Sequence, residues 1–400
     1  MTWTKPFIGP KAPWSTALLA IGLMTLFVLL GSQTAFGQTT YVQYGDFDDD
    51  GNGNLQWVGT VAPSVDLLDA STLNASFPKD PFGGSLYGVI TKTESGAISS
   101  SPVRIPTTNS QTLRIMSGFN YDVSILGGVK FEDDTHAPGK GSNNTIIVDN
   151  GATVGNISNQ TGSVYGGLAI NNPASSNNEP SVTQNTVIID GIIGQSVYGG
   201  ATNFDTTTYT VDVTHNTVII NEYAQVNGTN DEAGKVVGGS IAYDNDPTAT
   251  VNFVATKGSV DHNIVTMNGG EVRTIIGGMH ELGDTGAIAS ANEVYIYGGS
   301  VTGDIIGGLI FNGVGTVDSN EVTLISGVID GHVYGGLGDA ASGISITGNI
   351  INFGIQDGEN TGTVAVGNNL YGGFNKDTGG TKATGNTINF YSGRNTVDGT

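Results

Sequence analysis

The 400-residue sequence contains no cysteine, and charged residues make up only 12% of it. Without cysteine the protein has neither disulfides nor thiolate chemistry. Its stability must therefore come from another source, and a repetitive hydrogen-bonded ladder would be sufficient. Basic residues are the scarcer charge, with 14 Lys and Arg against 36 Asp and Glu. Nucleic acids and acidic membranes are bound through clustered basic side chains, so we expect neither as a partner.

Glycine, by contrast, is abundant, at 62 of 400 residues, about twice the usual share. Such an excess indicates either low-complexity disorder or a fold built from many short, tightly turned units. Apolar residues make up 38% of the chain and are rich in Val and Ile. That fraction is large enough to bury a core, so the sequence predicts a folded protein.

Residues 1–37 have the three regions of an export signal peptide. Two lysines precede an apolar stretch from Ala17 to Leu30, and Ala35-Phe36-Gly37 follows as a cleavage site with small residues at −3 and −1. The stretch fits a signal peptide better than a bilayer-spanning helix, and an uncleaved anchor is the alternative. Cleavage would leave Gln38 first and 12 basic against 36 acidic residues, a formal charge of −24.

One sequence unit returns eight times from residue 144 onward, and its second copy, residues 185–200, reads NTVIIDGIIGQSVYGG. Counting Asn as position one, positions three and five are always large and apolar, whereas positions two and four vary. Because strand side chains alternate between faces, the pattern predicts a strand with one buried face and one tolerant face. The copies begin at Asn144, Asn185, Asn216, Asn263, Asn292, Asn320, Asn349 and Asn386.

An apolar pair followed by Gly-Gly recurs later in the unit, as in Val197-Tyr198 and Ile275-Ile276. We expect the paired glycines to adopt positive φ and to bend the chain sharply at the same corner of every turn. Longer copies contain extra polar residues, such as 222–234 and 240–262. Insertions into repeats usually map to one face, so we expect these residues to protrude as loops.

Stacking of successive units at the strand spacing of ~4.8 Å buries the aliphatic positions in continuous columns. The expected fold class is therefore all-β, a parallel β-helix or β-solenoid over residues 111–400. The recurrent Asn either stacks as an amide ladder or reflects the turn preference of Asn, and both explanations stay open. The tyrosines before Gly-Gly should stack as a structural stripe rather than a ligand platform. These are Tyr165, Tyr198, Tyr334 and Tyr371.

Residues 38–110 lack the repeat and contain more Pro, Ser and Thr than the rest. A solenoid needs a cap to shield its open end, so we expect an irregular β-rich cap in this region. A separate binding element is the alternative interpretation.

The most specific local motif is YGDFDDDGNGN at residues 44–54. Its spacing is similar to that of EF-hand and related Asp-rich calcium loops, with Gly51 at the sharp turn of position six. Position twelve is Trp57 instead of a bidentate Glu, so the predicted calcium site is weak, and a solvated acidic turn is the alternative. Oxygen ligands at positions one, three, five, seven and nine are Asp46, Asp48, Asp50, Asn52 and Asn54.

No catalytic constellation stands out. The histidines lie far apart without a companion Ser or Asp motif, and no two occur at i, i+4, so we expect exposed turn residues. Acidic pairs such as Asp133-Asp134 and Asp244/Asp246 leave a polysaccharide-active β-helix enzyme, a lyase or glycoside hydrolase, as the alternative function. Basic partners for such chemistry are lacking, so the sequence predicts no enzyme and no catalytic residues. The histidines are His136, His215, His262, His280 and His332.

The N-T-V-x-I-x-G strand with its following V-Y-G-G resembles the repeats of bacterial autotransporter passenger regions, over about residues 111–400. The resemblance implies a right-handed β-helix, exported and then displayed on the cell surface or secreted, which commonly serves adhesion to a host or neighbouring cell. A purely structural spacer stays open beside adhesion. The resemblance also implies a C-terminal β-barrel in the outer membrane, the protein's only membrane contact. The sequence stops at Thr400 before any barrel, so we expect a fragment.

Overall fold

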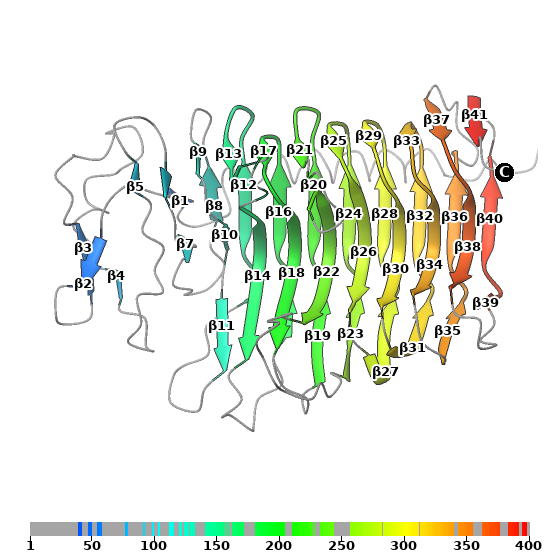
Figure 1. Ribbon diagram of the computed structural model, residues 1–400, viewed down its shortest axis with the longest axis horizontal. Helices are drawn as coiled ribbons and strands as arrows, with labels where there is room; N and C mark the ends of the chain where they lie inside the picture. The colour runs from blue at the N-terminus through cyan, green and yellow to red at the C-terminus, as the bar shows by residue number, and fades with distance from the viewer. Residues whose placement is uncertain are drawn as a thin grey trace, which may run out of the picture. The chain divides into compact units, whose positions relative to one another are not determined.

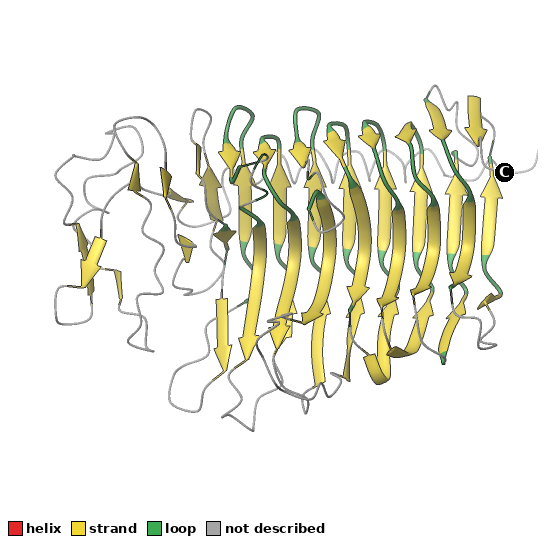
Figure 2. Ribbon diagram, viewed as in Figure 1, coloured by secondary structure: helices red, strands yellow, loops and turns green. Residues whose placement is uncertain are grey.

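The computed structural model describes separate strands between residues 39 and 121 and most of residues 124–397. Every described regular element is a β-strand (Figure 2). Among these residues no helix of membrane-spanning length and hydropathy occurs. The chain divides into two units, residues 1–39 and 40–400, and the strands described below belong almost entirely to the second. The longest gaps after residue 124 are 133–140, 172–180, 205–209, 244–256, 355–361 and 377–382.

The described residues of the second unit form a parallel β-solenoid, which confirms the predicted fold class (Figure 1). A full coil contributes one strand to each of four sheets, here numbered I to IV in their order along the coil. Equivalent strands of successive coils pair in parallel, as Val187 pairs with Val218 and Val218 with Val265. In Figure 1 these strands lie side by side from cyan to red.

Sheet I contains the predicted Asn-initiated strand of each repeat. From β12 to β36, positions three and five are buried and positions two and four only partly buried, which confirms the predicted alternation. Its ten strands are β1 (Thr39–Tyr41), β8 (Thr112–Ile115), β12 (Thr145–Val148), β16 (Thr186–Ile189), β20 (Thr217–Ile220), β24 (Ile264–Met267), β28 (Glu293–Ile296), β32 (Glu321–Leu324), β36 (Ile350–Phe353) and β40 (Thr387–Phe390).

Sheet II follows after a short turn and consists mainly of strands of two residues. One of the two points into the interior, as Val226 does in β21. Its nine strands are β9 (Asn120–Tyr121), β13 (Thr153–Val154), β17 (Ile192–Ile193), β21 (Gln225–Val226), β25 (Glu271–Val272), β29 (Ser300–Val301), β33 (Gly327–Ile329), β37 (Thr363–Val366) and β41 (Arg394–Val397).

Sheet III contains the apolar pair and the Gly-Gly of each repeat, and its strands are the longest. Its main path is β7 (Val103–Arg104), β10 (Ile125–Leu126), β14 (Val164–Asn171), β18 (Val197–Phe204), β22 (Lys235–Tyr243), β26 (Thr274–His280), β30 (Ile305–Phe311), β34 (Val333–Asp339) and β38 (Leu370–Asn375). A further strand, β11 (Val129–Glu132), pairs with β14 beside this path.

The predicted protruding loops 222–234 and 240–262 are wrong in part. Residues 225–226 belong to β21, residues 240–243 to β22, and residues 257–261 form a strand of sheet IV. Strands of this sheet follow connections of unequal length, but each ends two residues before the Asn of the next repeat, as residues 210–214 do before Asn216. The apolar residue three positions before that Asn, such as Val213 or Val260, is the regular signal that the sequence prediction missed. The seven strands are β15 (Ser181–Thr183), β19 (Thr210–Thr214), β23 (Lys257–Asp261), β27 (Gly283–Ser290), β31 (Gly313–Asp318), β35 (Ile344–Thr347) and β39 (Ala383–Thr384).

Two small antiparallel sheets lie within residues 38–110, whereas β1 and β7 of that region take part in sheets I and III. The prediction of a cap there stays a prediction. The strands of the small sheets are β2 (Phe47–Asp49), β3 (Asn54–Trp57) and β4 (Phe77–Pro78), and β5 (Thr91–Lys92) with β6 (Ile98–Ser99).

The coil encloses two interiors. The large interior is bounded by sheets I and II and the first half of sheet III, and aliphatic side chains such as Val218 and Val236 fill it in columns. The small interior lies between the second half of sheet III and sheet IV, where Ile241 packs with Val213 and Val260. Burial of these columns is the main source of stability, at about 25 cal/mol per Å² of apolar surface.

The recurrent Asn forms a buried ladder at the boundary of the two interiors. Each side-chain Nδ2 donates to Oδ1 of the Asn in the next coil over 2.8–3.0 Å, and the backbone N–H donates to the same oxygen. Nδ2 also donates to a carbonyl of sheet IV, as Asn292 does to Val260 at 2.9 Å. Of the two explanations left open by the sequence, the structure shows the amide ladder.

The Gly-Gly pairs serve a different purpose from the one predicted. They lie inside the strands of sheet III, and none of the described pairs has a positive φ. A Cβ on Gly277 would overlap the carbonyl of Gly307, and a Cβ on Gly278 would overlap the amide of Asn292. Glycine is therefore required because the Asn ladder packs directly against sheet III, and not because the chain turns there.

Candidate functional site

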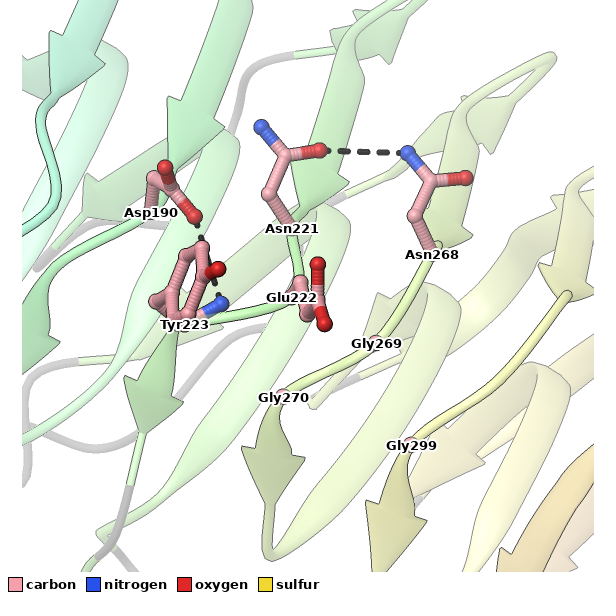
Figure 3. A pocket seen from close by; sticks show the side chains of 8 residues that line it. All are labelled: Asp190, Asn221, Glu222, Tyr223, Asn268, Gly269, Gly270 and Gly299. Carbon is pink, nitrogen blue, oxygen red and sulfur yellow. Dashed lines mark hydrogen bonds between the residues drawn. The ribbon is translucent and has the colours of Figure 1, made fainter.

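A groove of about 630 Å³ lies on the surface where sheet I passes into sheet II. It crosses the coils of β16, β20, β24 and β28, so residues far apart in sequence meet there. Its lining consists of Asp190, Asn221, Glu222, Tyr223, Asn268, Gly269, Gly270 and Gly299 (Figure 3).

The groove arises because turns of unequal length stand side by side. Four residues connect β20 to β21 and include Glu222 and Tyr223, which project beyond the neighbouring turns. Only two residues connect β16 to β17, and three connect β24 to β25. Two of those three are Gly269 and Gly270, and Gly270 has a φ of 80° that favours glycine. A bulky turn next to a turn with two glycines leaves a hollow.

Hydrogen bonds fix the polar edges of the groove. Asp190 Oδ1 accepts from the backbone N–H of Tyr223 at 3.2 Å, and Asn268 Nδ2 donates to Asn221 Oδ1 at 3.1 Å. Figure 3 shows Tyr223 beside Asp190 on one side, the Asn pair on the other, and Glu222 between them. The backbone N–H of Asn221 donates to Ile189 of the coil before, so the solenoid ladder holds the corner rigidly.

The groove offers a mixed set of polar groups beside one aromatic ring. Tyr223 is 58% exposed, although a ring of that size usually buries most of its surface. Two carboxylates accept hydrogen bonds, and two side-chain amides both donate and accept. Among the described residues, no lysine or arginine lines the groove. Such a site suits a ligand with many hydroxyl groups or with positive charge, and it disfavours an anion.

A second exposed tyrosine stands at the same corner one coil beyond Asn268. Tyr297 is 47% exposed, and its ring stacks on Tyr295 with centroids 6.4 Å apart. Tyr295 Oη donates to Glu293 Oε2 at 2.7 Å. Burial, the hydrogen bond to Glu293 and the nearby negative charges together raise the pKa of Tyr295, so its phenol stays protonated and keeps donating.

Glu293 forms a carboxylate pair with Glu321 on the outer face of sheet I. The two residues are partners in the parallel register of β28 and β32. Like charges directly opposite each other are unfavourable, and hydrogen bonds offset part of this repulsion. Glu321 Oε1 accepts from Thr323 Oγ1 at 3.0 Å and from Asn352 Nδ2 at 2.7 Å.

The predicted calcium loop lies mostly outside the described residues. Asp48 belongs to β2 and Asn54 begins β3, and these strands pair antiparallel as a hairpin. Asp46, Asp50 and Asn52 lie outside the described residues. The calcium site therefore stays a prediction.

The histidines follow the prediction of exposed turn residues only in part. His215 and His262 are exposed, have left-handed φ values of 58° and 52°, and stack with ring centroids 5.0 Å apart. For His280 the prediction is wrong, because this residue is fully buried in β26 between Ile241 and Ile310. Position in the repeat, rather than residue type, decides its burial. His136 lies outside the described residues.

The predicted tyrosine stripe is present but interrupted. Tyr165 stacks on Tyr198 at 4.8 Å, and Tyr334 stacks on Tyr371 at 5.1 Å. Between these pairs the same position holds aliphatic residues, which form an apolar cluster with Tyr334 on the side of sheet III away from the large interior. These contacts support the structural interpretation of the stripe. The aliphatic residues are Val237, Ile276 and Ile306.

Sequence reasoning missed the groove, although the sequence contained a usable signal. The number of residues between position five and the apolar pair before Gly-Gly changes from coil to coil. The coil of Asn216 has 15 such residues, against seven in the coils on either side, and these 15 include Glu222 and Tyr223. Aligning the coils on sheet II would have placed this turn beside the glycines of the next one. No protein family, characterised protein or solved structure shows significant similarity to the chain.

Proposed function

We propose that the protein is exported and acts as a binding protein at the cell surface or in the medium, as a passenger of the autotransporter type. Its solenoid is a rigid scaffold, and the groove at the corner of sheets I and II is its contact site. The proposed partner is a ligand on a host or neighbouring cell.

The observation that carries this proposal is the exposed Tyr223 beside the carboxylates and amides of an open groove. Burying an aromatic side chain of this size in a contact is favourable compared with leaving it in water, and tyrosine loses little conformational entropy on binding. The groove lies on coils held by continuous backbone ladders, so little ordering is needed when a ligand binds. The signal-peptide pattern of residues 1–37 supports export.

Export is tested by producing the full chain in a bacterium with two membranes. We expect the protein in the periplasm or beyond it, with an N-terminus at Gln38 after sequencing. A chain that keeps its first 37 residues in the cytoplasm would contradict the proposal.

Binding is tested by applying the exported product to arrays of glycans and of extracellular matrix proteins. We expect at least one class of ligand to be retained, and we expect Tyr223→Ala to weaken that retention about tenfold. Phe311→Ala is the matched control, because Phe311 is 42% exposed and lies outside the groove. If Tyr223→Ala and Phe311→Ala behave alike, the groove is not the contact site.

The alternative of a polysaccharide-active enzyme is tested on the same polysaccharides by measuring released reducing ends or unsaturated products. The pair of Glu293 and Glu321 is the arrangement that favours this alternative, since two close carboxylates are what glycoside hydrolysis uses. Turnover that Glu321→Gln abolishes would replace the binding proposal with an enzymatic one.

A further inference from the structure

We propose that the ligand is a linear, neutral polysaccharide that runs along the solenoid axis and lies on two aromatic platforms, Tyr223 and Tyr297. This inference rests on the proposed function and adds the chemical class of the ligand, its direction and a second contact that lies beyond the groove lining.

The two platforms are separated by one coil that presents no large side chain. Tyr223 belongs to the coil of β20 and Tyr297 to that of β28, and the intervening turn of β24 contains Gly269 and Gly270. Two coil spacings place the two turns about 9.6 Å apart. A saddle between two raised rings therefore runs across the strands, and an extended chain that crosses it touches both rings at once.

The polar groups of the saddle match hydroxyl groups better than they match peptide or phosphate. A hydroxyl both donates and accepts, and Asn221 and Asn268 offer both functions within one site. Asp190 and Glu222 add acceptors for hydroxyl donors. The face of a sugar ring is apolar and its rim is polar, so a tyrosine under the face and amides at the rim contact it together.

Charge decides against acidic polysaccharides. Two carboxylates line the groove, Glu293 lies on the strand that leads to Tyr297, and no described basic side chain lines the groove. The whole chain carries 36 acidic against 14 basic residues. An anionic polymer would be repelled on approach, whereas a neutral one is unaffected by this field.

The second platform is held in place from behind. Tyr297 stacks on Tyr295, whose hydroxyl is anchored by Glu293 at 2.7 Å. This chain of contacts fixes the ring before the ligand arrives and reduces the entropy that binding would otherwise lose. Glu293 is therefore a positioning residue for the platform.

The experiment uses the exported full-length product and soluble neutral polysaccharides: β-glucan, mannan, galactan and dextran, followed by oligosaccharides of two to eight units from the polymer that binds. Isothermal titration calorimetry should show affinity rising with length until the oligosaccharide reaches both tyrosines, and little gain beyond that length. We expect Tyr223→Ala and Tyr297→Ala each to weaken binding about tenfold, and the double variant about a hundredfold if the sites are independent.

The role of Glu293 is tested by a conservative pair. Glu293→Ala frees the Tyr295 hydroxyl and should weaken binding about threefold, whereas Glu293→Gln keeps an acceptor and should bind like the unaltered protein. Phe311→Ala is again the control for an exposed aromatic residue, and thermal unfolding confirms that each variant is folded.

Three results would overturn the inference. The first is no neutral polysaccharide bound below about 1 mM. The second is an affinity that neither Tyr297→Ala nor oligosaccharide length changes. The third is groove-dependent binding of a cationic polypeptide such as polylysine in place of the sugars. In the third case only the ligand class is wrong, and the proposed contact site stands. If instead the ligands found on the arrays bind Tyr223→Ala as well as the unaltered protein, the groove is not the contact site.

Discussion

The two interiors of the coil differ in how they accommodate polar groups. At the edge of the large interior, the buried asparagines from Asn185 to Asn349 each donate and accept within the ladder. In the small interior, both ring nitrogens of His280 and the hydroxyl of Thr202 are buried without a hydrogen-bond partner. A buried polar group is tolerated when it is paired and destabilises the fold when it is not.

This difference shows which part of the coil specifies the fold. The ladder requires an Asn at one position and glycines opposite it in every coil, and the aliphatic columns beside it are uniform. The small interior accepts Ala169, Ile241, His280 and Ile310 at one position of sheet III. The large interior therefore fixes the coil, and the small interior adapts to it.

The largest effect is expected from a charge inside the large interior. Val218 is fully buried in β20, and Val218→Asp would place a carboxylate among aliphatic side chains without a partner. We expect a loss of about 5 kcal/mol or more in the free energy of unfolding, enough to unfold part of the stack. Chemical denaturation followed by circular dichroism measures it. Ile219→Asp, on the outer face of the same strand, is the control and should keep the fold; equal effects would refute the assigned faces.

The second-largest loss of stability is expected from breaking the Asn ladder. Asn292→Ala removes the acceptor for the backbone and side-chain N–H groups of Asn263 and the donor for Val260 and Asn320. Each unpaired buried group costs about 1–3 kcal/mol, so we expect a loss of about 3–5 kcal/mol after relaxation. Asn268→Ala removes an exposed asparagine and should cost less than about 0.5 kcal/mol. Similar unfolding midpoints for the two variants would show that the ladder contributes little.

The smallest effect is expected from replacing His280, the unpaired polar residue of the small interior. His280→Ile matches Ile241 and Ile310 of the neighbouring coils and removes two unpaired nitrogens, so we expect a gain of about 1–3 kcal/mol at neutral pH. A loss of stability in thermal or chemical unfolding would show that the histidine has a partner in solution.

The pH dependence gives an independent check on His280. Burial lowers its pKa from 6.5 to about 4, so the unfolded chain binds a proton that the folded chain does not in this range. Stability should therefore fall as pH is lowered from about 6.5 to about 4, by up to about 3 kcal/mol from this residue. The difference between the unaltered protein and His280→Ile, measured across this range, isolates that part. A constant difference would mean that His280 titrates normally.

Much of the fold could be predicted because the alternation of apolar and variable positions in the repeat shows which side chains are buried. Valine and isoleucine at positions three and five alternate with variable residues, and that period of two admits no helix. Sheet IV was missed although its strands end two residues before each Asn of the repeat, whereas the reason for the glycine pairs could not be predicted. Gly278 is needed because of Asn292, which follows it in the sequence at a spacing that differs from coil to coil and meets it only when the coil closes.

The sequence by itself determined the class of fold, because alternation and repetition require that equivalent strands stack and bury the same face. Only the tertiary structure decided where the groove lies. Tyr223, Asn268 and Tyr297 come from three separate repeats, and their neighbourhood depends on how many residues each turn contains. Stacking in parallel register converts those small differences in length into a groove lined by Tyr223, with Tyr297 exposed beyond it.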